Sequence, residues 1–163
     1  MGSILSNTLM LDRSKTMNID PQQTLGQALQ SMPGGSPSSI PFVVRLVEKP
    51  ASPMALPGAI DLHRHDCLHI LLEKGLSLMD EAFVVGFTMG NDPHTRPFHL
   101  KLFKQISSVF YPKLYRFSPE HWNTFEQGVL YGQSVTIKNL NRYDFQSHCN
   151  TPLHSLRRLV GIA

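Results

Sequence analysis

Two neighbouring apolar segments, residues 60–74 and 78–89, constrain the fold of this chain more than any other feature. Leucine and isoleucine occur at every helical angle in the first segment, and the second is apolar nearly all round. Because a surface helix keeps one polar face, both segments are expected to form buried helices. Gly75 stands where the residue after a helix C-terminus belongs, and Ser77 with Asp80 resembles a capping box that opens the second helix. The sequence therefore predicts a buried helical hairpin with a tight turn.

Histidine and carboxylate side chains interrupt this apolar hairpin where helix geometry brings them together. His65 and His69 are four residues apart, so they lie on one face of the first helix, and Asp66 flanks that face. Glu81 follows His69 by twelve positions, beyond the turn, so an antiparallel hairpin brings it back opposite the histidines. The spacing therefore predicts that all four side chains share one buried site.

A buried site of this kind needs a compensating partner. Polar and charged groups lose their water on burial, at a cost of several kcal/mol apiece when nothing replaces it. A divalent cation replaces it directly, because it binds carboxylates and neutral imidazoles together, and this mixed set suits Zn, Fe, Mn or Co better than Ca. We expect zinc first, with Fe, Mn, Co and Mg as alternatives, on the ligands His65, Asp66, His69 and Glu81. A metal-free cluster of hydrogen bonds among the same side chains stays open as the alternative.

Two further residues of the first helix are expected to play other roles. Cys67 lies about 200° around the helix from the histidine face, so we expect it to be a small core hydrophobe rather than a ligand. Glu73 follows His69 by four residues, which makes it either a fifth member of the site or a solvent-facing charge. The nearness of the helix end favours solvent.

The other helical segments each begin with a capping residue and proline, or carry apolar residues at helical spacing. The first is opened by Asp20-Pro21 and ended by residues 33–35, and the second covers residues 98–110. The third is opened by Ser118-Pro119-Glu120, and a short fourth one by Thr151-Pro152. Residues 42–47 suit a strand or a helix, and the prolines that follow forbid a long element. Residues 1–18 show no helical or strand periodicity of apolar residues and are expected to be loosely attached to the domain. We predict a single all-α domain over 1–163, a helical bundle with proline-rich connections.

Composition and motifs exclude several classes of protein. The net charge of +3 and the pI near 9.0 come from scattered basic residues, which argues against nucleic-acid binding. Two cysteines build neither a disulfide framework nor a zinc ribbon, so a reducing cytoplasm is expected. No apolar run approaches the roughly 18 residues that span a bilayer, and nucleotide-binding and serine-hydrolase motifs do not occur. The pair Gly86 and Gly90 is expected to serve packing inside the chain, although a homo-oligomer stays open.

At His65, Asp66, His69 and Glu81 the sequence resembles the ubiquinone (coenzyme Q) biosynthesis protein family called Coq-four, whose signature is H-D-x-x-H, eleven residues and then Glu. The spacing of this chain matches that signature, and residues 40–134 can be laid along the family. The resemblance implies an all-helical fold and a divalent metal held by the four motif residues. It also implies a role in quinone synthesis, with the motif residues as the catalytic residues.

Two functions follow from this resemblance. The first is an enzyme, a metal-dependent lyase or oxidative decarboxylase that removes the carboxylate at ring carbon one of a polyprenylated benzoquinone precursor. The second is a carrier or scaffold that binds an isoprenoid lipid, such as a prenyl phosphate, without turning it over. In either case other quinone-biosynthesis proteins are implied as partners, and the location is cytoplasmic with peripheral attachment to the inner membrane face.

Overall fold

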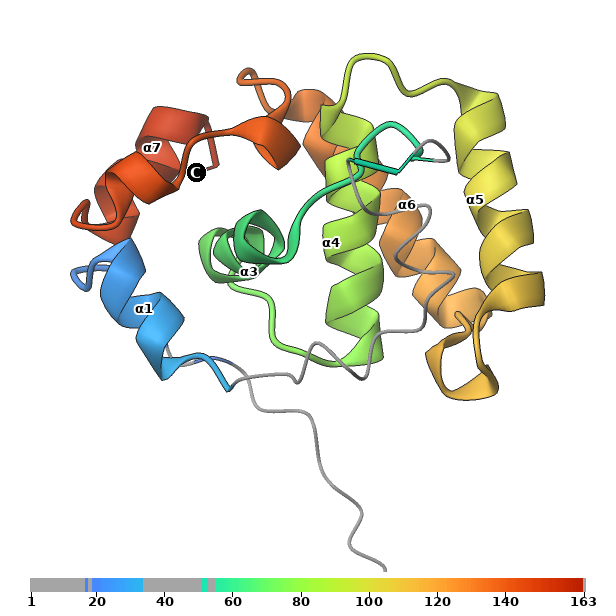
Figure 1. Cartoon of the computed structure of the whole chain (residues 1–163), viewed down its shortest axis with the longest axis horizontal. Coiled ribbons are helices and arrows are strands. Elements are labelled where there is room, and N and C mark those ends of the chain that lie inside the picture. The colour runs from blue at the N-terminus through green and yellow to red at the C-terminus, as the bar shows by residue number, and fades with distance from the viewer. Residues whose placement is uncertain (1–16, 18, 34–50, 53–54, 163) are drawn as a thin grey trace, which may run out of the picture.

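The computed structural model describes residues 17, 19–33, 51–52 and 55–162, and all the regular elements within these ranges are helical (Figure 1). The α-helices are α1 (Leu25–Ser31), α3 (Leu62–Leu71), α4 (Leu78–Asn91), α5 (Pro97–Phe110), α6 (Pro119–Ser134) and α7 (Leu153–Val160). Short 3-10 turns lie at Lys113–Tyr115, Leu140–Arg142 and Gln146–His148. The all-α prediction is confirmed. The expectations for residues 1–16 and 34–50 lie outside the described residues.

The helix α4 lies between two apolar cores and contributes to both. On one side, Val84 and Phe87 pack with α1, α3, α7 and the chain after α6. On the other side, Val85 and Met89 pack with α5 and α6. Figure 1 shows this order, with α1 and α7 at one end of the molecule and α5 at the other. The prediction that this helix is buried nearly all round is therefore confirmed for its middle and last turns.

Glycines let α4 and α6 pack backbone against backbone. A Cβ atom at Gly86 would lie 2.1 Å from the carbonyl oxygen of Phe125, and one at Gly128 would lie 2.2 Å from that of Phe83. Gly90 and Gly132 repeat this arrangement one turn further along. The spacing of four on α4 thus serves contact inside the chain, as expected, and its partner is a second glycine pair on α6 that sequence reasoning missed.

The helix α1 begins later than the sequence predicted. Asp20 and Pro21 form a turn in which the amide of Gln23 donates to the carbonyl of Asp20 at 3.1 Å. The helix starts after Thr24, which shares a reciprocal capping box with Gln27. A capping box satisfies two backbone donors that a single aspartate leaves unpaired, so it sets the start of this helix.

The end of α3 also differs from the prediction. The left-handed residue is Glu73, with a φ of 53°, and not Gly75. The amide of Lys74 donates to the carbonyl of His69 at 2.8 Å, and the amide of Glu73 donates to that of Ile70 at 3.1 Å. This is the Schellman closure. Gly75 follows it in the turn, where its carbonyl is used by the site described below. By contrast, Ser77 caps α4 as predicted, because its hydroxyl accepts from the amide of Asp80.

The glycine contact gives a direct test of this packing. We expect Gly128→Ala to lower the free energy of unfolding by about 3 kcal/mol, because the new methyl group meets a backbone carbonyl that cannot rotate away. Gln133→Ala, at an exposed position of the same helix, should change it by less than about 0.5 kcal/mol. Urea denaturation followed by the fluorescence of Trp122, the one tryptophan, measures both. Equal stabilities of the two variants would show that the helices do not approach this closely.

Candidate metal centre

Two histidines of α3 and one glutamate of α4 meet across the helical hairpin. Nε2 of His65 lies 2.9 Å from Oε1 of Glu81, and Nε2 of His69 lies 3.0 Å from Oε2 of the same carboxylate. The two imidazole rings are 4.6 Å apart between centroids. The potential ligand atoms of these three residues all lie within 4.8 Å of one another. We call this group the His65–His69–Glu81 cluster.

His69 has an acceptor at each of its ring nitrogens. Its side chain is fully buried, and Nδ1 lies 2.8 Å from the carbonyl oxygen of Gly75. A carbonyl only accepts, so Nδ1 carries the proton. In a neutral imidazole Nε2 then presents a lone pair toward the carboxylate of Glu81, and two acceptors at 3.0 Å need a proton or a cation between them. Donation of the other ring nitrogen to a carbonyl is also how metal-binding histidines are oriented in proteins.

The carboxylate of Glu81 is held in its ionised form. Burial alone would raise its pKa, but the charge of His65 and the hydrogen bonds from His65 and His69 outweigh this and hold the pKa well below its usual range. The side chain is one-third exposed, so the cluster opens toward solvent on one side. The donor set of two imidazoles and one carboxylate is one that divalent zinc accepts.

Asp66 lies beside the cluster and is not part of it. Its Oδ1 atom is 4.0 Å from Nδ1 of His65, the ring nitrogen opposite the one that faces Glu81. Burial raises the pKa of Asp66. Asp66 is turned about 100° from His65 but only about 60° from His69, and its carboxyl group feels the charges of His65, His69 and Glu81. The structure thus brings three of the four predicted site residues together, with the fourth at the border of the cluster.

Cys67 lies in the core and Glu73 at the surface, as the sequence predicted. Cys67 is fully buried, and desolvation raises the pKa of its thiol to about 12. It therefore stays protonated and does not serve as a thiolate ligand. Glu73 is exposed and forms an ion pair with Arg157 of α7, so it is not a fifth member of the cluster.

A short segment before α3, residues 56–60, lines a small cavity together with His65. Gly58 has a φ of 87°, and a Cβ atom there would lie 2.7 Å from the Cα atom of Met89. Its amide donates at 2.9 Å to the carboxylate of Asp92, which follows α4. The role of Asp92 in holding residues 56–60 against α4 has no local sequence signal.

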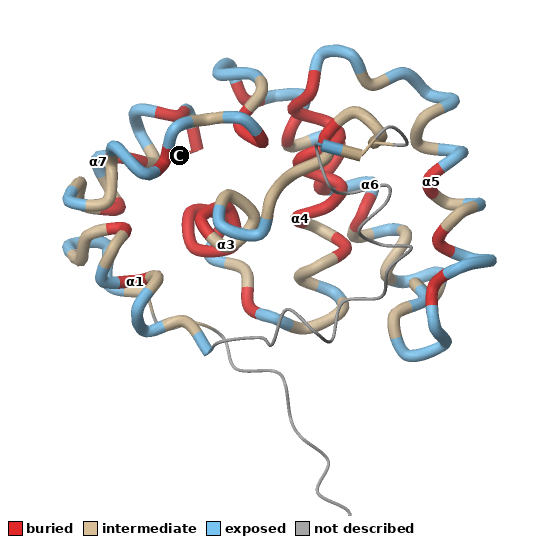
Figure 2. Tube along the Cα trace, in the orientation of Figure 1, coloured by how far each residue is buried: buried red, intermediate tan, exposed pale blue. Residues whose placement is uncertain are grey.

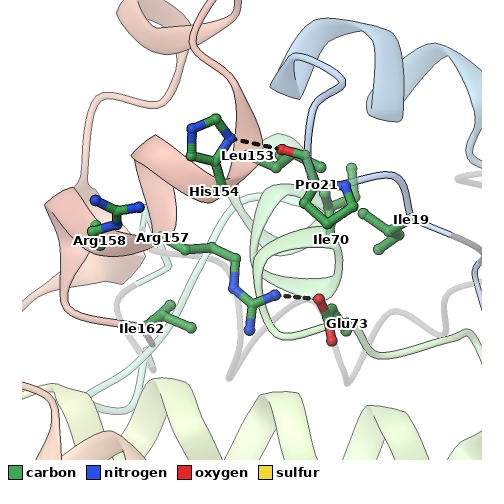
Figure 3. A pocket seen from close by; sticks show the side chains of 9 residues that line it. All are labelled: Ile19, Pro21, Ile70, Glu73, Leu153, His154, Arg157, Arg158 and Ile162. Carbon is green, nitrogen blue, oxygen red and sulfur yellow. Dashed lines mark hydrogen bonds and ion pairs between the residues drawn. The ribbon is translucent and has the colours of Figure 1, made fainter.

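The described cavities do not include a ready chamber for a ring beside the cluster. The cavity that His65 helps to line has a volume of about 20 Å³, which is room for a water molecule. A larger cavity of about 210 Å³ lies between α3, α7 and the segment before α1, and Glu73 pairs with Arg157 at its wall (Figure 3). Its lining residues include none of the cluster.

Comparison with known protein families, with curated proteins and with solved structures finds no match to this chain. Membership of the Coq-four family therefore stays a prediction from the motif. Among the described residues, no helix is both long and apolar enough to cross a bilayer.

The Asp92 anchor predicts a pH dependence of stability. Burial would raise the pKa of Asp92, but hydrogen bonds from His94 and from the amide of Gly58 lower it. A lowered folded-state pKa stabilises the fold above the ordinary value of 3.8, and this contribution is lost as the pH falls through the lowered value. In urea denaturation at neutral pH we expect the free energy of unfolding of wild type to exceed that of Asp92→Asn by about 1–2 kcal/mol. This difference should shrink steadily as the pH falls below 3.8. A difference that stays constant with pH would contradict the assignment.

Proposed function

We propose that this chain is a metal-binding protein whose His65–His69–Glu81 cluster holds one divalent cation, with zinc first and Fe, Mn, Co or Mg as alternatives. The observation that carries the proposal is the state of His69, which is buried with an acceptor at both ring nitrogens. A cation replaces the proton that this arrangement otherwise needs. Asp66 then serves as the outer partner of His65, on the ring nitrogen that faces away from Glu81.

The ligand count favours a site with an open position. A tetrahedral ion with three protein ligands keeps one position for water or for an oxygen of a bound molecule, as catalytic zinc sites do. Because one third of the Glu81 side chain is exposed, we expect this open position on the solvent side of the cluster. The backbone orients the proposed ligands: the carbonyl of Gly75 fixes the tautomer of His69, and the helical hairpin fixes the distance from His69 to Glu81.

The resemblance to the Coq-four family supplies the proposed substrate class, a polyprenylated ring precursor of ubiquinone. In the enzyme version the chain is a lyase that removes the carboxylate at ring carbon one, and His65, His69 and Glu81 carry the metal that polarises the ring oxygens. In the second version it is a carrier or scaffold for an isoprenoid lipid among other quinone-biosynthesis proteins, in the cytoplasm and at the inner membrane face. Because the cavity beside His65 holds only about 20 Å³, the enzyme version needs residues 56–60 to move aside before a ring can reach the metal.

Zinc titration calorimetry tests the metal site. We expect one zinc per chain, a loss of affinity of at least roughly 100-fold in His69→Ala or Glu81→Gln, and a loss of about tenfold in Asp66→Asn. His94→Ala is the matched control, since this imidazole is exposed and lies outside the cluster. The zinc affinity of this variant should equal that of wild type. Unchanged zinc binding in His69→Ala would sink the proposal and leave a hydrogen-bonded cluster.

A turnover experiment separates the enzyme from the carrier. Zinc-, iron- or manganese-loaded protein is incubated, with and without oxygen, with a prenylated hydroxybenzoate labelled at its carboxyl carbon. The enzyme version predicts release of labelled carbon dioxide that is lost in Glu81→Gln. Binding of the same compound without release, for every metal and both atmospheres, would refute the enzyme and leave the carrier.

A further inference from the structure

The helix α5 lies at the edge of the molecule in Figure 1 and carries a second apolar face that belongs to neither core of the described residues. Only Phe103 and Ser107 of its fourteen residues are buried, whereas nine residues of α4 are. Figure 2 shows buried residues of α5 on the side toward α6 and exposed ones on the opposite side. The helix α5 therefore packs on the rest of the described protein through a narrow strip around Phe103 and Ser107, and most of its other residues are exposed.

Large apolar side chains follow the outward side of α5. Phe98, Leu102 and Val109 fall within about 40° of one another at 100° per residue, which makes them one stripe along the helix. The exposed fractions of Phe98 and Val109 are 61% and 64%. Phe110, the last residue of α5, is turned about 100° from Val109 and borders the stripe with an exposed fraction of 59%, and Leu114, beyond the helix, is 86% exposed. An apolar stripe this long is unusual on a surface without a partner.

The same segment carries only positive charge. Residues 93–117 contain five lysines and arginines and no aspartate or glutamate. Lys101 and Lys113 are exposed close to the stripe in sequence, and Lys104 pairs with Glu126 of α6. Apolar side chains bordered by basic ones are the pattern of a helix that lies in the headgroup region of an anionic bilayer. We call the stripe and its basic border, from Arg96 to Arg116, the α5 surface.

We propose that the α5 surface docks this protein on an anionic lipid bilayer, with α5 parallel to the membrane plane. Phe98, Leu102, Val109, Phe110 and Leu114 enter the boundary between headgroups and acyl chains, and Lys101 and Lys113 meet the lipid phosphates. A second copy of this chain suits the surface less well, because a two-fold contact would press one basic border against another. The inference concerns a surface apart from the metal site: it adds a docking surface to the membrane attachment named under the proposed function, and it is argued from α5 alone, without a bound cation or the family resemblance.

Vesicle flotation of the full chain tests this docking. We expect binding to phosphatidylcholine vesicles in which about a third of the lipid is phosphatidylglycerol, weaker binding as salt increases, and little binding to pure phosphatidylcholine. The double variant Lys101→Gln, Lys113→Gln should weaken binding about 25-fold, since each basic residue near an anionic surface contributes about a fivefold factor. The control Arg142→Gln, Arg158→Gln removes the same charge from other exposed positions and should change binding by less than about threefold.

A second pair of variants tests the apolar stripe. Phe98→Ser, Val109→Ser should weaken vesicle binding by roughly 100-fold, while Leu159→Ser, at an exposed position of α7, should leave it unchanged. Trp122 fluorescence, which reports on its contact with Phe103 of α5, checks that each variant stays folded. The proposal is overturned by equal binding to neutral and anionic vesicles, by equal effects of test and control variants, or by no binding. It is also overturned if the serine pair abolishes self-association of the chain instead of vesicle binding, because the surface is then a protein interface.

Discussion

The close contact of α4 and α6 is the constraint on which the rest of the structure depends. Four glycines let these helices touch along their backbones, with each missing side chain facing a carbonyl of the other helix. This contact commits one side of α4 to α6 and leaves the other side for α3 and the core around it. Glu81, in the first turn of α4, therefore faces α3 and is held at a fixed distance from its histidines.

The turn between α3 and α4 then completes the cluster. The Schellman closure at Glu73 ends α3 just after His69 and leads the chain back so that the carbonyl of Gly75 meets His69. The hydrogen bond to Gly75, with the carbonyl of Lys74 beside it at 3.4 Å, keeps the proton on Nδ1 and directs Nε2 toward Glu81. The cluster is thus a product of backbone geometry at the turn as much as of the side chains themselves, which explains how an imidazole without exposure keeps a defined chemical state.

Much of this site follows from sequence, and the parts that do not have physical reasons. The four-residue spacing of His65 and His69 and the hairpin length to Glu81 are local, so they predict the cluster correctly. Asp66 flanks this face, as its spacing from His69 predicts, and its Oδ1 atom lies 4.0 Å from Nδ1 of His65, so its service as a fourth ligand stays a prediction. The closure at Glu73 in place of Gly75 depends on where α3 stops, and that in turn depends on packing. The glycine pair of α6 acts through its contact with the glycine pair of α4. Because the two pairs are far apart in the sequence, no local pattern predicts this contact.

The central claim is that His65, His69 and Glu81 bind one metal ion together. X-ray absorption at the zinc edge of the zinc-loaded full chain examines it most directly. The structure predicts two imidazole nitrogens at about 2.0–2.1 Å and carboxylate or water oxygens at about 2.0–2.2 Å, without sulfur. A spectrum with a sulfur neighbour at about 2.3 Å, or with oxygen neighbours alone, would contradict it.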